Sequence, residues 1–338
     1  MTRFSSLIAI AIAALLTACG DEGSVGQSQE TTEQRSLTVR TPSGAPLNRD
    51  QPSAGIATPL QIVEVLSADD MGGRQTGTEG NAKARDYLLA QLKARDVRPL
   101  SKDYLHEFSF KNRDGETLQG RNLVGIIPGK AEGSGKVVVV TAHYDHIGIH
   151  DGEIFNGADD NASGVAGAFA VADHFLAEPP QHDVVIAFLD AEEMGLQGAR
   201  AFLKDQIVET ALIGLNINFD MLSQNSDNEL YAAGAWHRPE LVPLLQAIAD
   251  KAPVSLKLGH DDPALGQDDW TLQSDHAPFH QAGIPFVYFG VEDHQHYHKE
   301  SDEFRHVPQD FFARSIETVV MAAEMFDTEL GGLQPAAK

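Results

Sequence analysis

Imidazole and carboxylate side chains gather in five short stretches of this 338-residue sequence. In chain order they are His143 with Asp145, the acid pair Asp159 and Asp160, the acid pair Glu192 and Glu193, then Asp220, then His298. These nitrogen and oxygen donors, with no thiolate among them, form a set that suits Zn²⁺. Two such ions about 3.5–4 Å apart are a known hydrolytic arrangement. The residue types therefore predict a pair of zinc ions that share one carboxylate.

Each stretch taken alone also has an ordinary structural interpretation. In VVTAHYDHIG, Asp145 is placed to accept the second ring N–H of His143, yet most such pairs are plain polar contacts. The acids of NGADDNASG suit the N-terminus of the helix that follows. The adjacent glutamates of DAEEMGLQG, and Asp220 after an apolar run, are costly when buried without a cation or a retained proton. Only the combination indicates a metal site.

Alternating strands and helices must position these stretches. Apolar runs predict strands at 121–129, 136–143, 183–191, 212–222 and 285–290, and helical periodicity predicts helices at 81–97, 163–177, 196–206, 239–251 and 308–330. This alternation predicts an α/β fold with a mostly parallel sheet between helices. Ligands bind beyond the carboxyl ends of the strands in such sheets. Because His143, the glutamate pair, Asp220 and His298 each follow a strand, we expect them at one edge of the sheet.

These strings, in this order, resemble the di-zinc aminopeptidase family of metallopeptidases, metallopeptidase family 28, which includes the bacterial leucyl aminopeptidases. The family is related to the glutamate carboxypeptidases and the glutaminyl cyclases. The resemblance covers roughly residues 57–330. It implies a single globular domain with a mixed, mostly parallel sheet sandwiched between helices, the fold of zinc-dependent exopeptidases. We place this domain at 56–331, with a short C-terminal tail at 332–338.

The resemblance also implies a role for each residue of the site. The five implied ligands of two Zn²⁺ ions are His143 and Asp220 for one ion, Glu193 and His298 for the other, and Asp159 as the bridge between them. Glu192 matches the family glutamate that binds no metal and acts as general base toward a metal-bridging hydroxide. Asp145 and Asp160 are expected beside the ligands, and relatives have a cis peptide bond between the residues matching Asp159 and Asp160.

Several further residues are candidates for the surroundings of the site. The family string SDHAPF, with Ser274, Asp275 and His276, is assigned to the wall of a substrate pocket, to which Trp270 also contributes. His294, His296 and His298 alternate in EDHQHYHKE, but a three-histidine site would leave the carboxylates at the strand ends unpaired. His146 and His150 are expected to be ordinary loop residues. The spacing around Arg74 assigns it no role.

The function implied by the resemblance is a secreted aminopeptidase with two Zn²⁺ ions that removes N-terminal residues from peptides. Three alternatives stay open: a glutaminyl cyclase with one zinc, a carboxypeptidase on the same scaffold, and a receptor-like homologue without catalysis. Metal content and the choice between an aminoacyl anilide and an N-terminal glutamine peptide separate the first two. The sequence shows no arginine cluster for a substrate carboxylate, and it does not settle the oligomeric state.

The N-terminus carries a targeting signal. Residues 1–18 combine a basic start, a short apolar run and small residues, and they precede Cys19, the only cysteine of the chain. Leu16–Cys19 resembles a bacterial lipobox, so we expect cleavage before Cys19 and its acylation. Residues 19–55 are rich in polar residues and glycine and are expected to form a disordered tether. This predicts a lipid-anchored protein of a bacterial cell envelope, periplasmic or facing the outer membrane.

Composition excludes one class of partner. With 49 acidic and 25 basic residues the net charge is −24, the wrong sign for binding nucleic acid. A chain that is 42% hydrophobic and 22% charged can bury a large core. The expected partners are therefore peptide substrates and, through the N-terminal anchor, a membrane.

Overall fold

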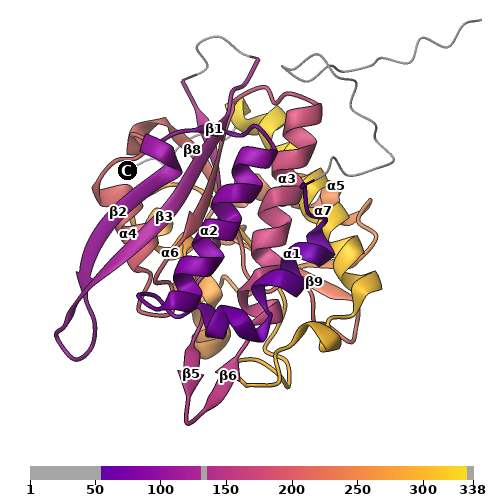
Figure 1. Ribbon diagram of the computed structural model, residues 1–338. Helices are drawn as coiled ribbons and strands as arrows, with labels where there is room; N and C mark the ends of the chain where they lie inside the picture. Colours follow the sequence, from indigo (N-terminus) through magenta and orange to yellow (C-terminus); the bar gives the residue numbers. More distant parts are fainter. Residues whose placement is uncertain (1–54, 131–134, 333–338) are drawn as a thin grey trace, which may run out of the picture. The chain divides into compact units, whose positions relative to one another are not determined.

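A mixed sheet of nine strands forms the centre of the described part of the chain, residues 55–130 and 135–332 of a computed structural model (Figure 1). The strand order is β1-β3-β7-β4-β8-β11-β9-β10, and β2 pairs with β3 outside this path. The strands are β1 (Arg98–Pro99), β2 (Leu105–Lys111), β3 (Thr117–Ile127), β4 (Val137–His143), β7 (Asp183–Leu189), β8 (Ile213–Phe219), β9 (Glu229–Ala233), β10 (Ser255–Leu258) and β11 (Phe286–Gly290). A separate hairpin pairs β5 (Gly148–His150) with β6 (Glu153–Phe155).

The middle of the sheet is parallel. Strand β4 pairs in parallel with β7 on one side and with β8 on the other, and β11 pairs in parallel with β8. All seven residues of β4 are buried, as are those of β8, which explains why their sequences are mostly apolar apart from the hydrogen-bonded Thr141, Asn216 and Asn218 and the terminal His143. Because these strands run in one direction, their carboxyl ends meet at one edge.

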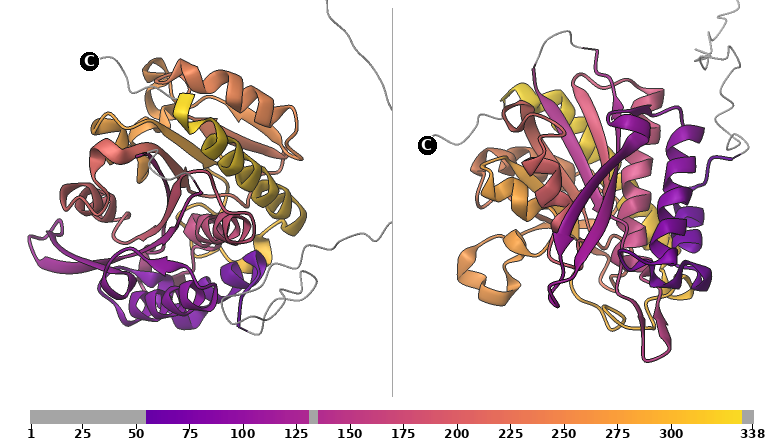
Figure 2. Two further views of the ribbon diagram at one scale, coloured as in Figure 1. Left: turned by 90° about the horizontal axis from the view of Figure 1, so that it is seen from above. Right: turned by 60° about the vertical axis from the view of Figure 1, so that its left-hand side comes forward.

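Helices cover both faces of this sheet (Figure 2). One face packs against α1 (Pro59–Leu66), α2 (Glu79–Ala94), α3 (Gly164–Ala177), α5 (Val242–Ala249) and α7 (Gln309–Glu329), while the other packs against α4 (Gln197–Lys204) and α6 (His276–Gln281). Alternation along β4 separates the two cores, since Val138 and Val140 face the larger set and Val137 and Val139 face α4 and α6.

The predicted fold class is confirmed. Each predicted strand and helix has a counterpart, whereas the strands β1, β2, β5, β6, β9 and β10 and the helices α1 and α6 were not anticipated. No helix of the described residues is long and apolar enough to cross a membrane. The predicted signal peptide and Cys19 lie outside the described residues, as does all but the last residue of the tether, so the lipid anchor stays a prediction.

Candidate metal centre

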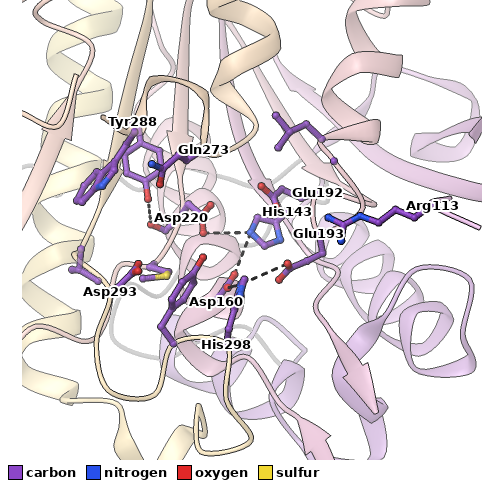
Figure 3. A pocket seen from close by; sticks show the side chains of 16 residues that line it. Arg113, His143, Asp160, Glu192, Glu193, Asp220, Gln273, Tyr288, Asp293 and His298 are labelled. Atoms are coloured by element: carbon purple, nitrogen blue, oxygen red, sulfur yellow. Dashed lines mark hydrogen bonds and ion pairs between the residues drawn. The ribbon is translucent and has the colours of Figure 1, made fainter. Parts of the chain in front are cut away.

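The predicted residues meet at the carboxyl edge of the parallel strands (Figure 3). His143 is the last residue of β4, and Asp220 directly follows β8. Glu192 and Glu193 follow β7 after a short turn, and His298 lies in the loop after β11. The topology therefore brings side chains from four strands together, as the strand-end argument predicted.

Asp160 lies between two groups of potential ligands. Its Oδ1 is 3.3 Å from His143 Nε2, which is itself 3.3 Å from Asp220 Oδ1. Its Oδ2 is 3.1 Å from His298 Nε2, and that atom is 3.6 Å from Glu193 Oε2. One carboxylate thus offers an oxygen to each side, which is the geometry of a ligand shared by two ions.

Two groups of three residues have donor atoms close enough to hold an ion. The first is His143, Asp160 and Asp220, and the second is His146, Asp160 and Glu193. Within each group the donor atoms lie within 4.8 Å of one another, and Asp160 belongs to both.

His146 was expected to be an ordinary loop residue, and that expectation is wrong. Its side chain is completely buried, and its Nδ1 lies 2.8 Å from Glu193 Oε1 and 3.8 Å from Asp160 Oδ2. One indication of this role was present in the sequence: His146 lies three residues after His143, just beyond the end of the strand. A histidine there points back toward the same edge of the sheet.

The prediction that Asp159 bridges the ions is also wrong by one residue. Asp159 Oδ1 accepts hydrogen bonds from Ser163 Oγ and from both Oγ and the backbone N–H of Ser223, while Oδ2 accepts from the backbone N–H of Gln224. The irregular helical segment Ala158–Ser163 turns adjacent side chains in different directions, so Asp160 faces His143, His146 and His298, whereas Asp159 Oδ2 lies 3.0 Å from His294 Nε2. The cis peptide bond accordingly joins Asp160 to Asn161.

Two buried residues hold the segment that carries Asp160. The Asp302 carboxylate accepts the backbone N–H groups of Asp159 and Asp160 at 3.0–3.1 Å. The fully buried Arg74 guanidinium donates to four backbone carbonyls, those of Leu66, Tyr144, Asn156 and Gly157. Arg74 therefore has a structural role that its sequence spacing did not reveal.

Asp145 acts differently from the prediction. The Nδ1 of His143 donates to the backbone carbonyl of Asp145 at 3.2 Å, and the nearest carboxylate oxygen is 3.8 Å away. That bond leaves the Nε2 lone pair of His143 directed at the carboxylates. The Asp145 carboxylate instead accepts the backbone N–H groups of Glu192, at 3.0 Å, and Glu193, at 3.4 Å.

The SDHAPF string lies behind the site, which corrects its assignment to the pocket wall. Ser274 Oγ donates to Asp220 Oδ2 at 2.6 Å, so it orients a candidate ligand. Asp275 and His276 are completely buried at the start of α6 and do not line the cavity. Trp270 does line it, as predicted.

Glu192 lines the cavity and has no hydrogen-bonded partner for its carboxylate among the described residues. Burial raises the pKa of Glu192 well above its ordinary value, His143 opposes this shift, and the negative charges of Glu193 and Asp275 add to it. Such a carboxylate holds a proton more readily than an exposed one. This is the property required of a group that accepts and returns a proton.

The site has the chemistry of a cation-binding centre. Burial disfavours the charged form of His143, yet the Asp220 and Glu192 charges outweigh burial and raise its pKa well above the ordinary value. His146 Nδ1 and Glu193 Oε1 lie 2.8 Å apart without hydrogen-bond geometry, and both atoms, like His146 Nε2, are buried without a hydrogen-bond partner. Buried carboxylates and orphaned donors of this kind fit divalent metal ions, which would satisfy them. The residues present therefore fit the predicted group.

A cavity of about 280 Å³ opens at the centre. Apart from the candidate ligands and Glu192, its lining includes Arg113, Met221, Trp270, Gln273, Tyr288, Val291, Asp293 and Tyr297. This volume is at the lower end of the range of about 300–1,000 Å³ common for small-molecule sites. It suits a small ligand or one end of a peptide.

The fold and this paired site define the chain as an α/β protein of the zinc-exopeptidase type. The sequence pattern of Peptidase family M28 matches residues 122–323, and the chain belongs to this family. The matched range contains every candidate ligand.

Individual relatives agree with this assignment. The chain is 27% identical over 241 residues to aminopeptidase YwaD of Bacillus subtilis, an alignment covering 68% of this chain and 50% of that protein. It is similar to the structure of BSAP, a zinc aminopeptidase from Bacillus subtilis, with a TM-score of 0.51, 25% identity and coverage of 63% and 52%. It also shares the fold of a glutaminyl cyclase from Porphyromonas gingivalis, with a TM-score of 0.63, 19% identity and coverage of 78% and 96%. The chain thus spans about half the length of YwaD and of BSAP.

Proposed function

We propose that this protein is an aminopeptidase with two zinc ions that releases N-terminal residues from peptides. The observation that carries the proposal is the placement of Asp160, whose two oxygens face separate groups of histidine and carboxylate donors. A protein with a single metal needs only one of these groups. Family membership and the similarity to a zinc aminopeptidase support the same reaction class.

The residues fit two ions in the following way. His143 and Asp220 would hold one, Glu193 and His298 would hold the other, and Asp160 would be shared. His146 is a further candidate at the second position. Bound there, the ions would polarise the scissile carbonyl and lower the pKa of the attacking water toward neutrality.

Glu192 moves the proton. Its carboxylate takes a proton from the attacking water and delivers it to the nitrogen of the leaving group. The backbone N–H of Glu192 is fixed by Asp145, which sets the side chain at the cavity wall.

The replacement Glu192→Gln tests this role. We expect turnover of a leucyl anilide to fall by about 10²- to 10⁴-fold, the usual contribution of a general base. Metal content, measured by elemental analysis, should stay at two ions because Glu192 is not among the proposed ligands. Glu292→Gln is the matched control, since that glutamate is exposed and lies outside the cavity.

Two results would contradict the proposal. Near wild-type turnover in Glu192→Gln would remove Glu192 as the base. One tightly bound ion per wild-type chain, with release of ammonia from an N-terminal glutamine peptide and no anilide hydrolysis, would identify a cyclase instead.

A further inference from the structure

A single arginine faces this otherwise acidic cavity. Among the described residues that line it, Arg113 is the only lysine or arginine, whereas five are aspartate or glutamate. Figure 3 shows its side chain reaching toward Glu192 and Glu193 from the side opposite Tyr288 and Asp293. The cavity therefore has one side with Asp293 and Tyr288 and an opposite side where Arg113 lies beyond Glu192 and Glu193.

The turn that carries Arg113 is ordered by its own hydrogen bonds. Residues 112–116 join β2 to β3, and the Asn112 side-chain oxygen accepts the backbone N–H groups of Asp114, at 3.1 Å, and Glu116, at 2.8 Å. Backbone bonds between Asn112 and both Glu116 and Gly115 close the same turn. Arg113 is therefore presented by a defined hairpin tip.

The guanidinium of Arg113 has no protein partner of its own. Within the described part of the chain, Arg113 forms no ion pair and no side-chain hydrogen bond, although Asp114 and Glu116 are its near neighbours. An arginine presents a planar fork of donors that matches a carboxylate. Its five donors are thus available to a ligand in the cavity.

A second hollow of about 370 Å³ adjoins the first on the far side of Glu193. The two share only Arg113 and Glu193, and the lining of the second also includes Gln75, Ile147 and Met194. A chain that extends from the first hollow into the second would therefore lie beside Arg113 and Glu193.

The direction of the proposed reaction assigns an end of the substrate to each side. Glu192 delivers its proton to the leaving nitrogen, so the leaving residues must lie on the side of Glu192. Arg113 occupies that side, while Asp293 and Tyr288, with the Trp270 ring 5.6 Å from that of Tyr288, lie where the N-terminal residue and its ammonium would be received. This charge distribution is complementary to a short zwitterionic peptide.

We propose that Arg113 binds a carboxylate on the leaving side of the substrate, which makes di- and tripeptides with a free C-terminus the preferred substrate class. This inference rests on the aminopeptidase function proposed above. Arg113 is a specificity residue here, since it binds the part of the substrate that is released and leaves the scissile bond to Glu192 and the metal centre.

The test compares substrates that differ only in the carboxylate. Leu-Ala, Leu-Ala-amide, Leu-Asp-amide and leucyl anilide are assayed with the metal-loaded wild type, with Arg113→Gln and with Arg113→Lys. In Arg113→Gln we expect KM for Leu-Ala to rise about tenfold, the effect of losing a partly exposed charged contact, with kcat little changed. KM for Leu-Ala-amide and the anilide should not change. The wild-type preference for Leu-Ala over its amide should also fall at high salt, because exposed charges are screened.

Two control variants distinguish the effect of Arg113 from a general loss of positive charge. Lys111→Gln removes a positive charge from the same hairpin, but that residue does not line the cavity, so the preference for Leu-Ala should survive. Arg113→Lys keeps the charge without the fork and should recover part of the affinity. A KM increase for Leu-Asp-amide equal to that for Leu-Ala would identify a side-chain carboxylate as an equally good partner.

The possible failures are distinguishable. Equal KM changes for the acid and its amide in Arg113→Gln, or no change for either, would overturn the role of Arg113 while leaving the aminopeptidase in place. Absence of turnover of all four substrates by the metal-loaded wild type would overturn the proposed function, and this inference with it.

Discussion

Exchanging each aspartate of the 159–160 pair for asparagine should separate metal binding from stability. Asp160 contacts His143 and His298 through its two oxygens, at 3.3 and 3.1 Å, so Asp160→Asn removes a charged donor from both metal positions. Even loss of a group outside the ligand set typically costs 10–100-fold in metal affinity, so we expect more than about 100-fold here.

Asp159→Asn should have the opposite effect. In the better orientation the asparagine oxygen replaces Oδ1 and keeps its three donors, from Ser163 and Ser223. The amide nitrogen then faces the backbone N–H of Gln224, which donates to Oδ2 at 3.1 Å in the wild type, and His294 Nε2, which lies 3.0 Å from the same oxygen. A buried donor left unpaired costs about 1–3 kcal/mol. At about 2–4 °C per kcal/mol for a large domain, the melting temperature should fall by about 2–12 °C.

Two measurements on the same samples separate the effects. Elemental analysis gives the metal content after loading, and calorimetry after chelation gives the melting temperature of the metal-free protein. We expect two ions and a lowered melting temperature for Asp159→Asn, and lost metal for Asp160→Asn. The reversed pattern would refute the assignment of Asp160 as the shared ligand and restore Asp159.

Two further predictions concern buried histidines. His146→Ala should weaken zinc binding at the second position by about 10–100-fold, measured by competition with a chelator. His150→Ala, which changes a nearby exposed histidine, should leave zinc binding unchanged. Equal zinc affinities for the two variants would exclude a role for His146. Burial lowers the pKa of His276 to about 3. As the pH falls below about 6.5, this histidine therefore becomes protonated in the unfolded chain but stays neutral in the folded protein. The folded state loses stability progressively between pH about 6.5 and about 3. His276→Gln should flatten the fall in melting temperature from pH 6.5 to 4 relative to wild type and to His150→Gln, and parallel curves for all three would contradict this assignment.

The sheet and its polar edge could be predicted because each signal is local. Val137–Val140 form a β-branched run that only a doubly buried strand accommodates, and the histidine that ends this strand must emerge at the carboxyl edge. The same argument placed Asp220 and His298 in the site. Strand β2 was missed because it lies outside the main strand path and pairs with β3 alone, where its alternating pattern is short.

The choice between Asp159 and Asp160 could not be made from spacing. The two are adjacent in a segment without regular helical geometry, so no periodicity states which carboxylate faces the strands. Arg74 was missed for a related reason, since its partners are backbone carbonyls, which leave no trace in side-chain types. The prediction placed three residues of the SDHAPF string on the cavity wall: Ser274, Asp275 and His276. A string shared with a family does not indicate whether its residues line the cavity or support the lining residues from behind.

The many aspartates around this site serve two distinct purposes. Asp160 and Asp220 face the space where cations would bind, whereas Asp145, Asp159 and Asp302 accept backbone N–H groups. Each of these three acceptors fixes a segment that bears other site residues: Asp145 fixes Glu192 and Glu193, Asp302 fixes Asp160, and Asp159 fixes the residues just after Asp220.

The supporting aspartates link the strand ends to one another. Because they join loops that follow different strands, a change at one strand end is transmitted to the ligands at the next. Backbone N–H donors compensate the charge of the supporting aspartates within the protein, while the carboxylates that face the cavity depend on the histidines and on bound cations. Part of the negative charge at the centre therefore has a structural role. Removing metal should leave only the carboxylates that face the cavity without compensation of their charge.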